Sequence, residues 1–419
     1  MEKLRKKVLW VCNLMPAFVA RKAGLGRAQN KEGWISGAAE KVNGSDELTL
    51  AVAFPVKDDE KLSGMAGNVR YYSFYEDTDH PEEYDPSLEA SIGRICEEFR
   101  PDVIHCFGTE YPHSLALQKL GEWKDKVIVH IQGVMESCAA RYYGGLDESV
   151  TDRATIRDLI RGDSLWRQKE KYEKRAEREK TVLSLAAYAC GRTAFDKTYV
   201  ESINPTCTYL ALNETLRPVF YTKLWERDAI VKHRIFMSQG NIPLKGLHTA
   251  IEALAIVKEK YEDAHIVVAG DDIVGKPFYK IPQYGKYLKS LLERLKLSDS
   301  VTFMGQLNEN EMCEEYLEAN AFVLASFTEN SPNSLGEAML LGVPSVVSKV
   351  GGVPSMAEED KEVLAFEAGD AKGLAEKICR LFGSDELQDE LRMAARKRAI
   401  LTHDAEANYK MLLWIYDKI

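Results

Sequence analysis

The chain has 419 residues, which is too long for one ordinary hydrophobic core and suits two domains of roughly 200 residues each. Its 55 basic and 65 acidic residues leave a formal charge of -10, which argues against nucleic acid as the main partner. The eight cysteines lack any Cys-x-x-Cys pair, and several lie in apolar runs. We therefore expect buried thiols in a reducing cytoplasm, with neither a disulfide framework nor a metal site.

Short apolar segments alternate with helical stretches along the chain. The amino terminus is basic and then apolar, but its apolar run is far too short for a signal peptide, so we expect a strand there. The predicted strands are residues 8–12, 48–54, 69–74, 103–107, 127–131, 186–191 and 207–212, then 235–238, 266–270, 301–304, 321–325, 345–348 and 363–366. This alternation is typical of parallel sheets covered by helices on both faces, so the predicted class is α/β with two doubly wound, Rossmann-like domains.

The domain boundary is predicted in a charged stretch that contains Pro218. We assign residues 1–215 to a first domain, 216–233 to a linker and 234–402 to a second domain. Residues 403–419 form an amphipathic helix, which either simply ends the chain or packs back on the first domain. The longest apolar run after the first strand is about half of what a membrane span requires, so we expect no spanning segment.

The most informative stretch begins at Ser326 and carries two carboxylates, Glu329 and Glu337, across a turn from strand to helix. We expect Ser331 to cap this helix, with Pro332 at its first position. The outward-pointing amides would then form a phosphate cradle from Asn333, Ser334 and Leu335. A phosphate cradle flanked by two carboxylates that can bind hydroxyls predicts a nucleotide-sugar site.

Blander interpretations exist for these carboxylates. Two glutamates on a helix and its preceding loop usually mark a solvated face, and paired carboxylates also serve glycosidases. The preceding strand, the Ser-Pro start and the Gly-x-Pro end favour a binding site over a solvated face. Hydrolysis is less favoured, because it needs no phosphate cradle.

The second domain opens with a strand, a turn and then Lys245, near the start of a helix. There its ammonium could neutralise a diphosphate, although a solvated lysine is the simpler interpretation of this residue alone. The position of Lys245 before the two-glutamate turn favours the binding role.

The motifs after residue 235 occur in a characteristic order: 238–246, 301–307, 325–329, Leu335-Gly-Glu-Ala-Met339, Gly342-Val-Pro344 and Val350-Gly-Gly352. In this order and spacing the chain resembles the retaining glycosyltransferases of family 4, which have the GT-B fold and include bacterial surface-polysaccharide enzymes. The resemblance is specific over residues 235–366. It is looser in the first half, where it rests on Gly33-Trp34 and on residues 101–105 and 129–133.

The resemblance implies a metal-independent enzyme that moves a hexosyl group from a nucleotide-diphosphate sugar to a hydroxyl with retention, without a cofactor. Glu329, Lys245 and Gln132 would face the reacting sugar, with Glu329 stabilising positive charge at the anomeric carbon. Glu337 would accept hydrogen bonds from both ribose hydroxyls. The other implied donor-binding residues are Gly240, Asn241, Ser331, Asn333, Ser334, Leu335, Gln306, Leu307 and, from the first domain, Gly33.

Two positions depart from the family pattern. The family commonly has an arginine a few residues before the Lys-Gly pair, where this chain has Gln239-Gly-Asn241, and Lys276 would have to replace its charge. Gln132 stands where many relatives have histidine; it can donate and accept hydrogen bonds but does not titrate. Proton removal from the acceptor would then fall to the leaving phosphate.

Other candidates rank lower. His105 and His130 lie on apolar strands and read as core histidines, with an acceptor-side role as the alternative for His130. His113 is predicted on a loop after a strand, where it could touch the acceptor. Asp77-Thr-Asp79 imitates a metal motif, but it stands among other acids and reads as a solvated loop, so no metal is predicted.

Residues 153–180 interleave many basic and acidic side chains, a pattern typical of exposed helices laced with ion pairs. The alternative is docking on the anionic inner membrane surface to meet a lipid-linked acceptor. The expected partners are a nucleotide-diphosphate sugar and a glycan or lipid-linked acceptor, with no nucleic acid. Two other functions stay open: a nucleotide-sugar epimerase of the same architecture, and a non-catalytic module that binds nucleotide-sugar or a partner enzyme.

Overall fold

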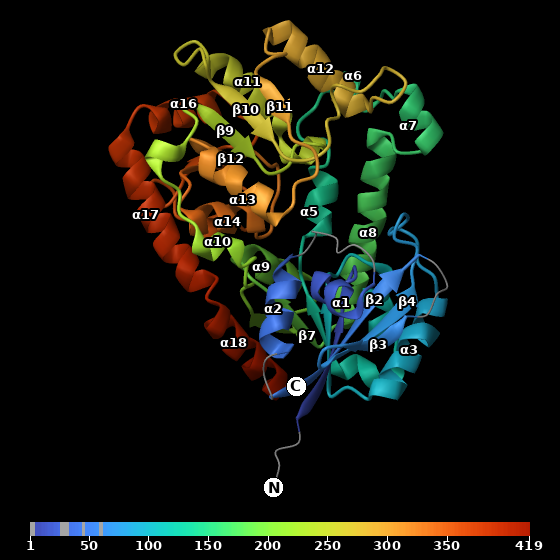
Figure 1. The fold of residues 1–419 in the computed structure, drawn as a ribbon. Helices are drawn as coiled ribbons and strands as arrows, with labels where there is room; N and C mark the ends of the chain where they lie inside the picture. The colour runs from blue at the N-terminus through green and yellow to red at the C-terminus, as the bar shows by residue number, and fades with distance from the viewer. Residues whose placement is uncertain (1–4, 26–32, 44–46, 58–61) are drawn as a thin grey trace. The chain divides into compact units, whose positions relative to one another are not determined.

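The computed structural model describes residues 5–25, 33–43, 47–57 and 62–419 (Figure 1). The chain divides into two compact units. The first comprises Met1–Glu136, Lys171–Arg217 and His403–Ile419, and the second comprises Ser137–Glu170 and Pro218–Thr402. These bounds differ from the predicted domains mainly in residues 137–170, which group with the second unit.

The first unit contains an eight-stranded sheet in the order β3-β4-β2-β1-β5-β6-β7-β8. All neighbouring strands pair in parallel except β3 and β4. The strands are β1 (Lys6–Val11), β2 (Leu48–Val56), β3 (Ser63–Ala66), β4 (Val69–Tyr75), β5 (Val103–Phe107), β6 (Val127–His130), β7 (Tyr188–Gly191) and β8 (Thr208–Ala211).

Successive residues of a strand point to opposite faces, so this sheet has a core on each side. Trp10 of β1 belongs to the core beneath α1 (Ala17–Ala23), α2 (Gly33–Asn43) and α18 (Ala405–Lys418). Its neighbour Leu9 belongs to the opposite core, covered by α3 (Ser87–Phe99), α4 (Pro112–Gln118), α8 (Leu165–Leu185) and α9 (Ala194–Ile203). The indole of Trp10 donates to the hydroxyl of Tyr416 at 2.8 Å, which fastens the carboxyl-terminal helix to the sheet.

The second unit contains a six-stranded parallel sheet in the order β11-β10-β9-β12-β13-β14. Its strands are β9 (Arg234–Met237), β10 (His265–Val268), β11 (Val301–Phe303), β12 (Ala321–Leu324), β13 (Ser345–Ser348) and β14 (Leu364–Phe366). The chain starts in the middle of this sheet, runs to one edge and returns to build the other. The connection direction therefore reverses between β9 and β12, where ligands of such sheets bind.

The main helices around this sheet are α11 (Leu247–Val257), α12 (Gln283–Leu295), α13 (Glu309–Glu318), α14 (Asn333–Leu341), α16 (Ala371–Phe382) and α17 (Asp385–Thr402). Shorter elements are η3 (Pro243–Lys245), α15 (Val353–Met356), and, from the segment 137–170, α6 (Glu148–Thr151) and α7 (Ile156–Arg161).

Close backbone packing explains why residues 137–170 belong to the second unit. A Cβ atom on Gly144, whose φ is +60°, would lie 2.4 Å from the carbonyl oxygen of Pro243, so only glycine allows this approach. His248 Nε2 donates to Gly144 O at 2.8 Å. Further along, the carboxylate of Asp158 accepts from the backbone N–H of Gln283 at 2.9 Å.

The predicted α/β class with two Rossmann-like sheets is confirmed, and each predicted strand has a counterpart. The eight cysteines are free thiols. Among the described residues, no helix has both the length and the apolar character that crossing a bilayer would demand.

Candidate functional site

A pocket of about 240 Å³ lies at the carboxyl ends of β9 and β12, where the connection direction of the second sheet reverses. Two residues predicted to face the reacting sugar, Lys245 and Glu329, both line it. The rest of its polar lining is Ser238, Gln239, Ser326, Asn333 and Ser334. Lys245 and Glu329, which are far apart in sequence, therefore lie together at the carboxyl edge of the second sheet.

Lys245 and Glu329 form a direct ion pair in this pocket. Lys245 Nζ lies 2.5 Å from Glu329 Oε1, and the Ser326 hydroxyl donates to the same oxygen at 2.6 Å. The side chains are 22% and 12% exposed, so the pair is partly shielded from water while still reaching the pocket. It offers an ammonium to an anion and a carboxylate to hydroxyl groups on one wall.

The loop that carries Glu329 is held by backbone contacts from neighbouring motifs. Gly352 N donates to Glu329 O at 3.0 Å, and Phe327 N donates to Leu244 O at 2.8 Å. The Ser348 hydroxyl donates to Ser326 O at 2.6 Å. Motifs that precede the glutamate loop in sequence and motifs that follow it therefore both hold it in place.

Lys245 lies in the short turn η3 rather than in the helix that follows. Gly246 ends this turn and caps α11 with a φ of +70°, and a Cβ atom there would lie 2.0 Å from Ala325 O. The backbone beside Lys245 therefore touches the end of β12, which brings the lysine within reach of Glu329.

The predicted phosphate cradle needs correction. Ser331 does not cap α14: the N-cap is Pro332, with no side-chain cap hydrogen bond, because the helix begins one residue later than a Ser331 cap requires. The Leu335 amide donates to Pro332 O at 3.0 Å, so it does not point outward as predicted. Of the three cradle residues, Asn333 and Ser334 line the pocket.

Glu337 is the fifth residue of α14, about one turn from the helix start, and is 5% exposed. It is not among the residues that line the pocket. Gly240 follows β9 in the turn toward η3. The ribose-binding role of Glu337 stays a prediction.

The residues expected to meet the base lie apart from this pocket. Gln306 and Leu307 follow β11, and the exposed Gln306 amide is 3.5 Å from Asp271 Oδ1. Asn241 borders a different pocket of the second unit, as does Lys276, the suggested replacement for the missing arginine. The structure therefore does not bring Lys276 into one pocket with Lys245.

In the first unit, Gln132 follows β6 and its amide donates to Glu214 Oε1 at 3.1 Å. Glu214 also pairs with Arg192 at 2.9 Å. Gln132 is thus part of a buried polar cluster at the end of β6. Gly33, the other first-unit residue predicted at the donor, is the first residue of α2.

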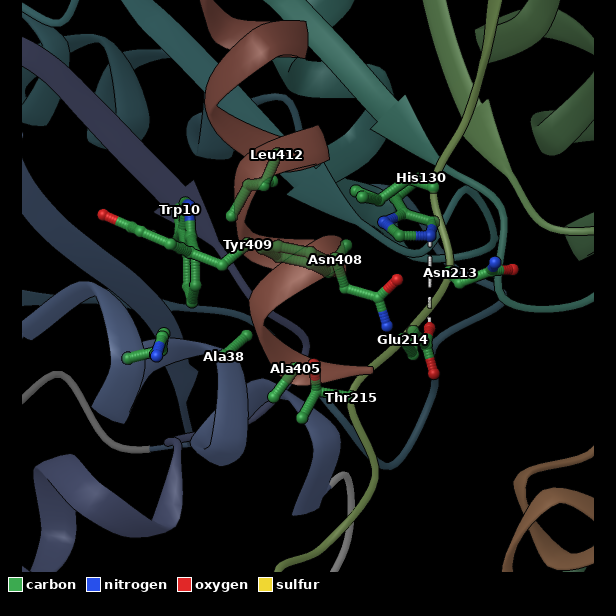
Figure 2. Close-up of a pocket in the computed structure, with 13 residues that line it drawn as sticks. Trp10, Ala38, His130, Asn213, Glu214, Thr215, Ala405, Asn408, Tyr409 and Leu412 are labelled. Atoms are coloured by element: carbon green, nitrogen blue, oxygen red, sulfur yellow. Dashed lines mark ion pairs between the residues drawn. The ribbon is translucent and has the colours of Figure 1, made fainter. Parts of the chain in front are cut away.

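His130 lies beside this cluster and lines a small pocket of the first unit (Figure 2). Figure 2 shows its ring directed at Glu214, 4.0 Å away. Burial, together with repulsion from His105 and Arg192, lowers the pKa of His130 well below its usual value, so the ring is neutral and the pair carries no ionic attraction. The pocket encloses about 40 Å³, enough for water and too little for a sugar ring.

The predicted position of His113 on an acceptor-facing loop is wrong. His113 lies within α4, has no exposed surface, and its Nδ1 is 2.9 Å from Glu76 Oε2. Burial alone would lower its pKa, but the Glu76 carboxylate outweighs burial and raises the pKa to about 10. The pair is a buried structural contact, missed because the loop after β5 is shorter than expected.

Residues 153–180 fall into two parts. Along α8 the basic side chains pair with acids of the first unit, as in Lys171 with Glu82 at 3.0 Å and Lys174 with Glu83 at 2.9 Å. The stretch before α8 contains α7 and lies in the second unit. Among the residues described, no group of three or more histidine, cysteine or acidic side chains could hold a metal ion.

Sequence reasoning missed His248, which lies in the apolar helix α11. Its Nδ1 is 3.0 Å from the Tyr284 hydroxyl, its Nε2 donates to Gly144 O, and its ring stacks on Phe327 with centroids 5.6 Å apart. A histidine in an otherwise apolar helical run was the available signal. His248 ties the segment 137–170 to the loop that carries Glu329.

We expect the free energy of unfolding to fall as the pH drops from 6.5 toward 4, because the buried ring of His248 stays neutral over that range. Burial lowers its pKa to about 4 from 6.5, so below pH 6.5 the unfolded chain binds the proton more strongly than the folded chain. The free energy of unfolding should therefore decrease from pH 6.5 toward pH 4 and show no contribution from His248 above that range.

Urea unfolding of the parent and of His248→Gln, across pH 4 to 8, measures this effect. The variant should lose part of the acid sensitivity. Equal pH slopes for the two proteins would contradict the prediction.

Two Rossmann-like units in one chain are the architecture of the GT-B fold. Residues 226–398 match the family described as Glycosyl transferases group 1. The chain thus has the GT-B fold, and its second half is similar in sequence to glycosyltransferases, including enzymes of polysaccharide synthesis.

Two sequence relatives illustrate this resemblance. The chain is 30% identical over 161 residues to the putative colanic acid biosynthesis glycosyltransferase WcaL of Escherichia coli, covering 36% of this chain and 37% of that protein. It is 28% identical over 183 residues to the sulfoquinovosyl transferase of Arabidopsis thaliana, covering 41% and 33%. The match thus spans only about a third of each of these two relatives.

Solved structures extend the likeness to the whole fold. Sucrose-phosphate synthase from Thermosynechococcus elongatus has a TM-score of 0.72 at 14% identity, covering 99% of both chains. Anabaena HepE in complex with UDP-glucose has a TM-score of 0.69 at 14% identity, covering 99% of this chain and 100% of that one. At these identities the likeness concerns the fold alone.

Proposed function

We propose that this chain transfers a hexosyl group from a nucleotide-diphosphate sugar to a hydroxyl of a glycan or lipid-linked glycan, with retention at the anomeric carbon and without a metal. The observation that carries the proposal is the Lys245–Glu329 pair, 2.5 Å apart at the sheet reversal, beside the first residues of α14. Anabaena HepE, which has a similar fold, was solved in complex with UDP-glucose, and this supports a nucleotide-diphosphate sugar as the donor.

In the proposed reaction, the diphosphate lies against Lys245 and the start of α14, where an ammonium and helix amides favour negative charge. Glu329 accepts hydrogen bonds from the sugar and stabilises the positive charge that develops at the anomeric carbon. The acceptor oxygen bonds to that carbon as the bond to the diphosphate breaks, and the leaving phosphate takes the acceptor proton. The proposed roles of Gln132 and Gly33 in the first unit rest on the family resemblance.

A thermal-shift screen with UDP-, GDP- and ADP-sugars identifies the donor, because a ligand at a hundred times its dissociation constant stabilises by roughly 2.7 kcal/mol. Product analysis then tests the reaction. Transfer to an acceptor with the donor's anomeric configuration, unaffected by EDTA, supports the proposal. Conversion of the donor alone indicates an epimerase, and binding without turnover with any acceptor indicates a non-catalytic module.

Glu337→Gln should weaken binding of the matching nucleoside diphosphate about 10- to 100-fold, because an amide replaces a carboxylate that accepts from two ribose hydroxyls. Isothermal titration calorimetry measures the change. Pyrophosphate, which lacks the ribose, is the internal control and should bind parent and variant equally. Equal nucleotide affinity in both proteins would remove Glu337 from the site.

A lipid-linked acceptor would require the enzyme to work at the inner surface of the membrane. The protein would then need a surface that contacts the bilayer, since the acceptor's lipid stays there.

A further inference from the structure

Helix α7 of the second unit is anchored through its polar face. Thr155 and Asp158 form a reciprocal capping box, and the Asp158 carboxylate also accepts from the backbone N–H of Gln283 at 2.9 Å. Asp158 is 1% exposed, so the one acid within the helix points into the protein. Gly162 ends the helix with a φ of +64°.

The apolar residues of α7 face solvent instead. Ile156, Leu159 and Ile160 are 59%, 65% and 80% exposed. Their i, i+3, i+4 spacing places them on one side of the helix, opposite Asp158. A surface helix normally buries such an apolar stripe, whereas α7 exposes its apolar side to solvent and directs Asp158 into the protein.

A second exposed apolar element lies near α7. The connection from β10 to α12 carries Phe278, 77% exposed, and Tyr279, 53% exposed. A pocket of about 350 Å³ is lined both by α7, through Arg161, and by this connection, through Lys276 and Lys280. The two elements therefore border one surface of the second unit, with α7 labelled in Figure 1.

The pocket is lined by four cations, Arg157, Arg161, Lys276 and Lys280, and by three carboxylates, Asp158, Asp163 and Asp271, so its net charge is positive by one although the chain as a whole carries -10. Arg157 is neutralised by Asp158 at 2.9 Å and by Asp163 at 2.7 Å. In the described part of the chain, no ion pair is formed by the other three cations at the pocket, Arg161, Lys276 and Lys280. Exposed aliphatic and aromatic side chains are thus flanked by three cations outside ion pairs and by one further carboxylate, Asp271.

We propose that α7 and the β10–α12 connection form a docking surface for an anionic lipid bilayer. Ile156, Leu159, Ile160 and Phe278 enter the boundary between headgroups and acyl chains, where apolar side chains leave water. The three cations, Arg161, Lys276 and Lys280, remain at the level of the anionic headgroups. The inference rests on the proposed function only for the reason to dock, which is a lipid-linked acceptor.

Vesicle flotation of the full chain tests this surface. The parent should float at low salt with vesicles of phosphatidylcholine and phosphatidylglycerol, and much less with phosphatidylcholine alone. The variant Leu159→Glu/Ile160→Glu should bind the anionic vesicles at least about tenfold more weakly, since each substitution removes an apolar side chain that enters the bilayer and adds a charge that the anionic headgroups repel. Lys276→Glu/Lys280→Glu should show a similar loss that is greatest at low salt.

The matched control is Lys397→Glu/Leu401→Glu on α17, where Leu401 is 72% exposed and the net charge changes by a comparable amount. This control should float like the parent. Failure of the parent to float, equal flotation of the α7 variant, or equal binding to neutral vesicles overturns the proposal. Self-association that the α7 variant abolishes, without vesicle binding, also overturns it in favour of a second copy as the partner.

The donor screen separates this inference from the proposed function. Binding of a nucleotide-sugar without binding to vesicles would support the donor site and overturn the docking surface. A protein that binds vesicles without a nucleotide-sugar does the reverse.

Discussion

Glu329→Gln is expected to lower turnover by about 100- to 1,000-fold, because the amide keeps the shape of the carboxylate but cannot stabilise positive charge at the anomeric carbon. The variant should still bind the donor. Glu329 Oε1 lies 2.5 Å from Lys245 Nζ, and removing the negative charge leaves the ammonium less neutralised for the diphosphate. We therefore expect equal or tighter affinity for the nucleoside diphosphate together with a large loss of kcat.

Two variants serve as controls for this result. Ser326→Ala removes the hydroxyl that donates to the same carboxylate oxygen at 2.6 Å, and it should cost about tenfold or less because the ion pair remains. Glu359→Gln changes a charge on a partly exposed acid that pairs with Lys349, away from the pocket, and should leave turnover unchanged. Full transfer activity in Glu329→Gln would exclude the proposed role.

The sheets were predictable because buried parallel strands appear as near-continuous apolar runs, whatever their neighbours in space. β3 was missed for the converse reason. Its Ser-Gly-Met-Ala sequence lacks an apolar run, and it is a strand only because it pairs antiparallel with β4 across a turn at Gly67, whose φ is +65°. Local pattern predicts core strands better than it predicts short edge strands.

The site was predictable where motif order implies topology. Lys245 follows β9 and Glu329 follows β12, and neighbouring parallel strands bring their carboxyl ends to one edge of the sheet. The exact helix start after Glu329 was not predictable, because Ser331 and Pro332 both suit positions near an N-cap.

The packing of residues 137–170 depends on contacts remote in sequence. His248 and Gly144 are 104 residues apart, and neither has a local pattern that names the other. The burial of His113 likewise depends on Glu76, which comes from a different segment of the first unit. Such pairs become visible only when the fold brings them together.

Gly246→Ala is expected to lower the free energy of unfolding by about 2–4 kcal/mol. Alanine there would adopt a strained φ of +70° and place its Cβ 2.0 Å from Ala325 O, a backbone atom at the end of β12. Either η3 or the end of β12 must move. Because Lys245 is the last residue of η3, the displacement should also separate it from Glu329 and weaken donor binding.

Gly305→Ala separates the two causes. Gly305 has a φ of +73°, but a Cβ atom there would meet nothing within 4 Å, so alanine carries the conformational strain without the collision. We expect Gly305→Ala to cost about 1 kcal/mol in urea unfolding. The excess in Gly246→Ala then measures the contact between η3 and β12. Equal losses in the two variants would mean that the backbone yields freely at Gly246, and the close approach could not then be what holds Lys245 against Glu329.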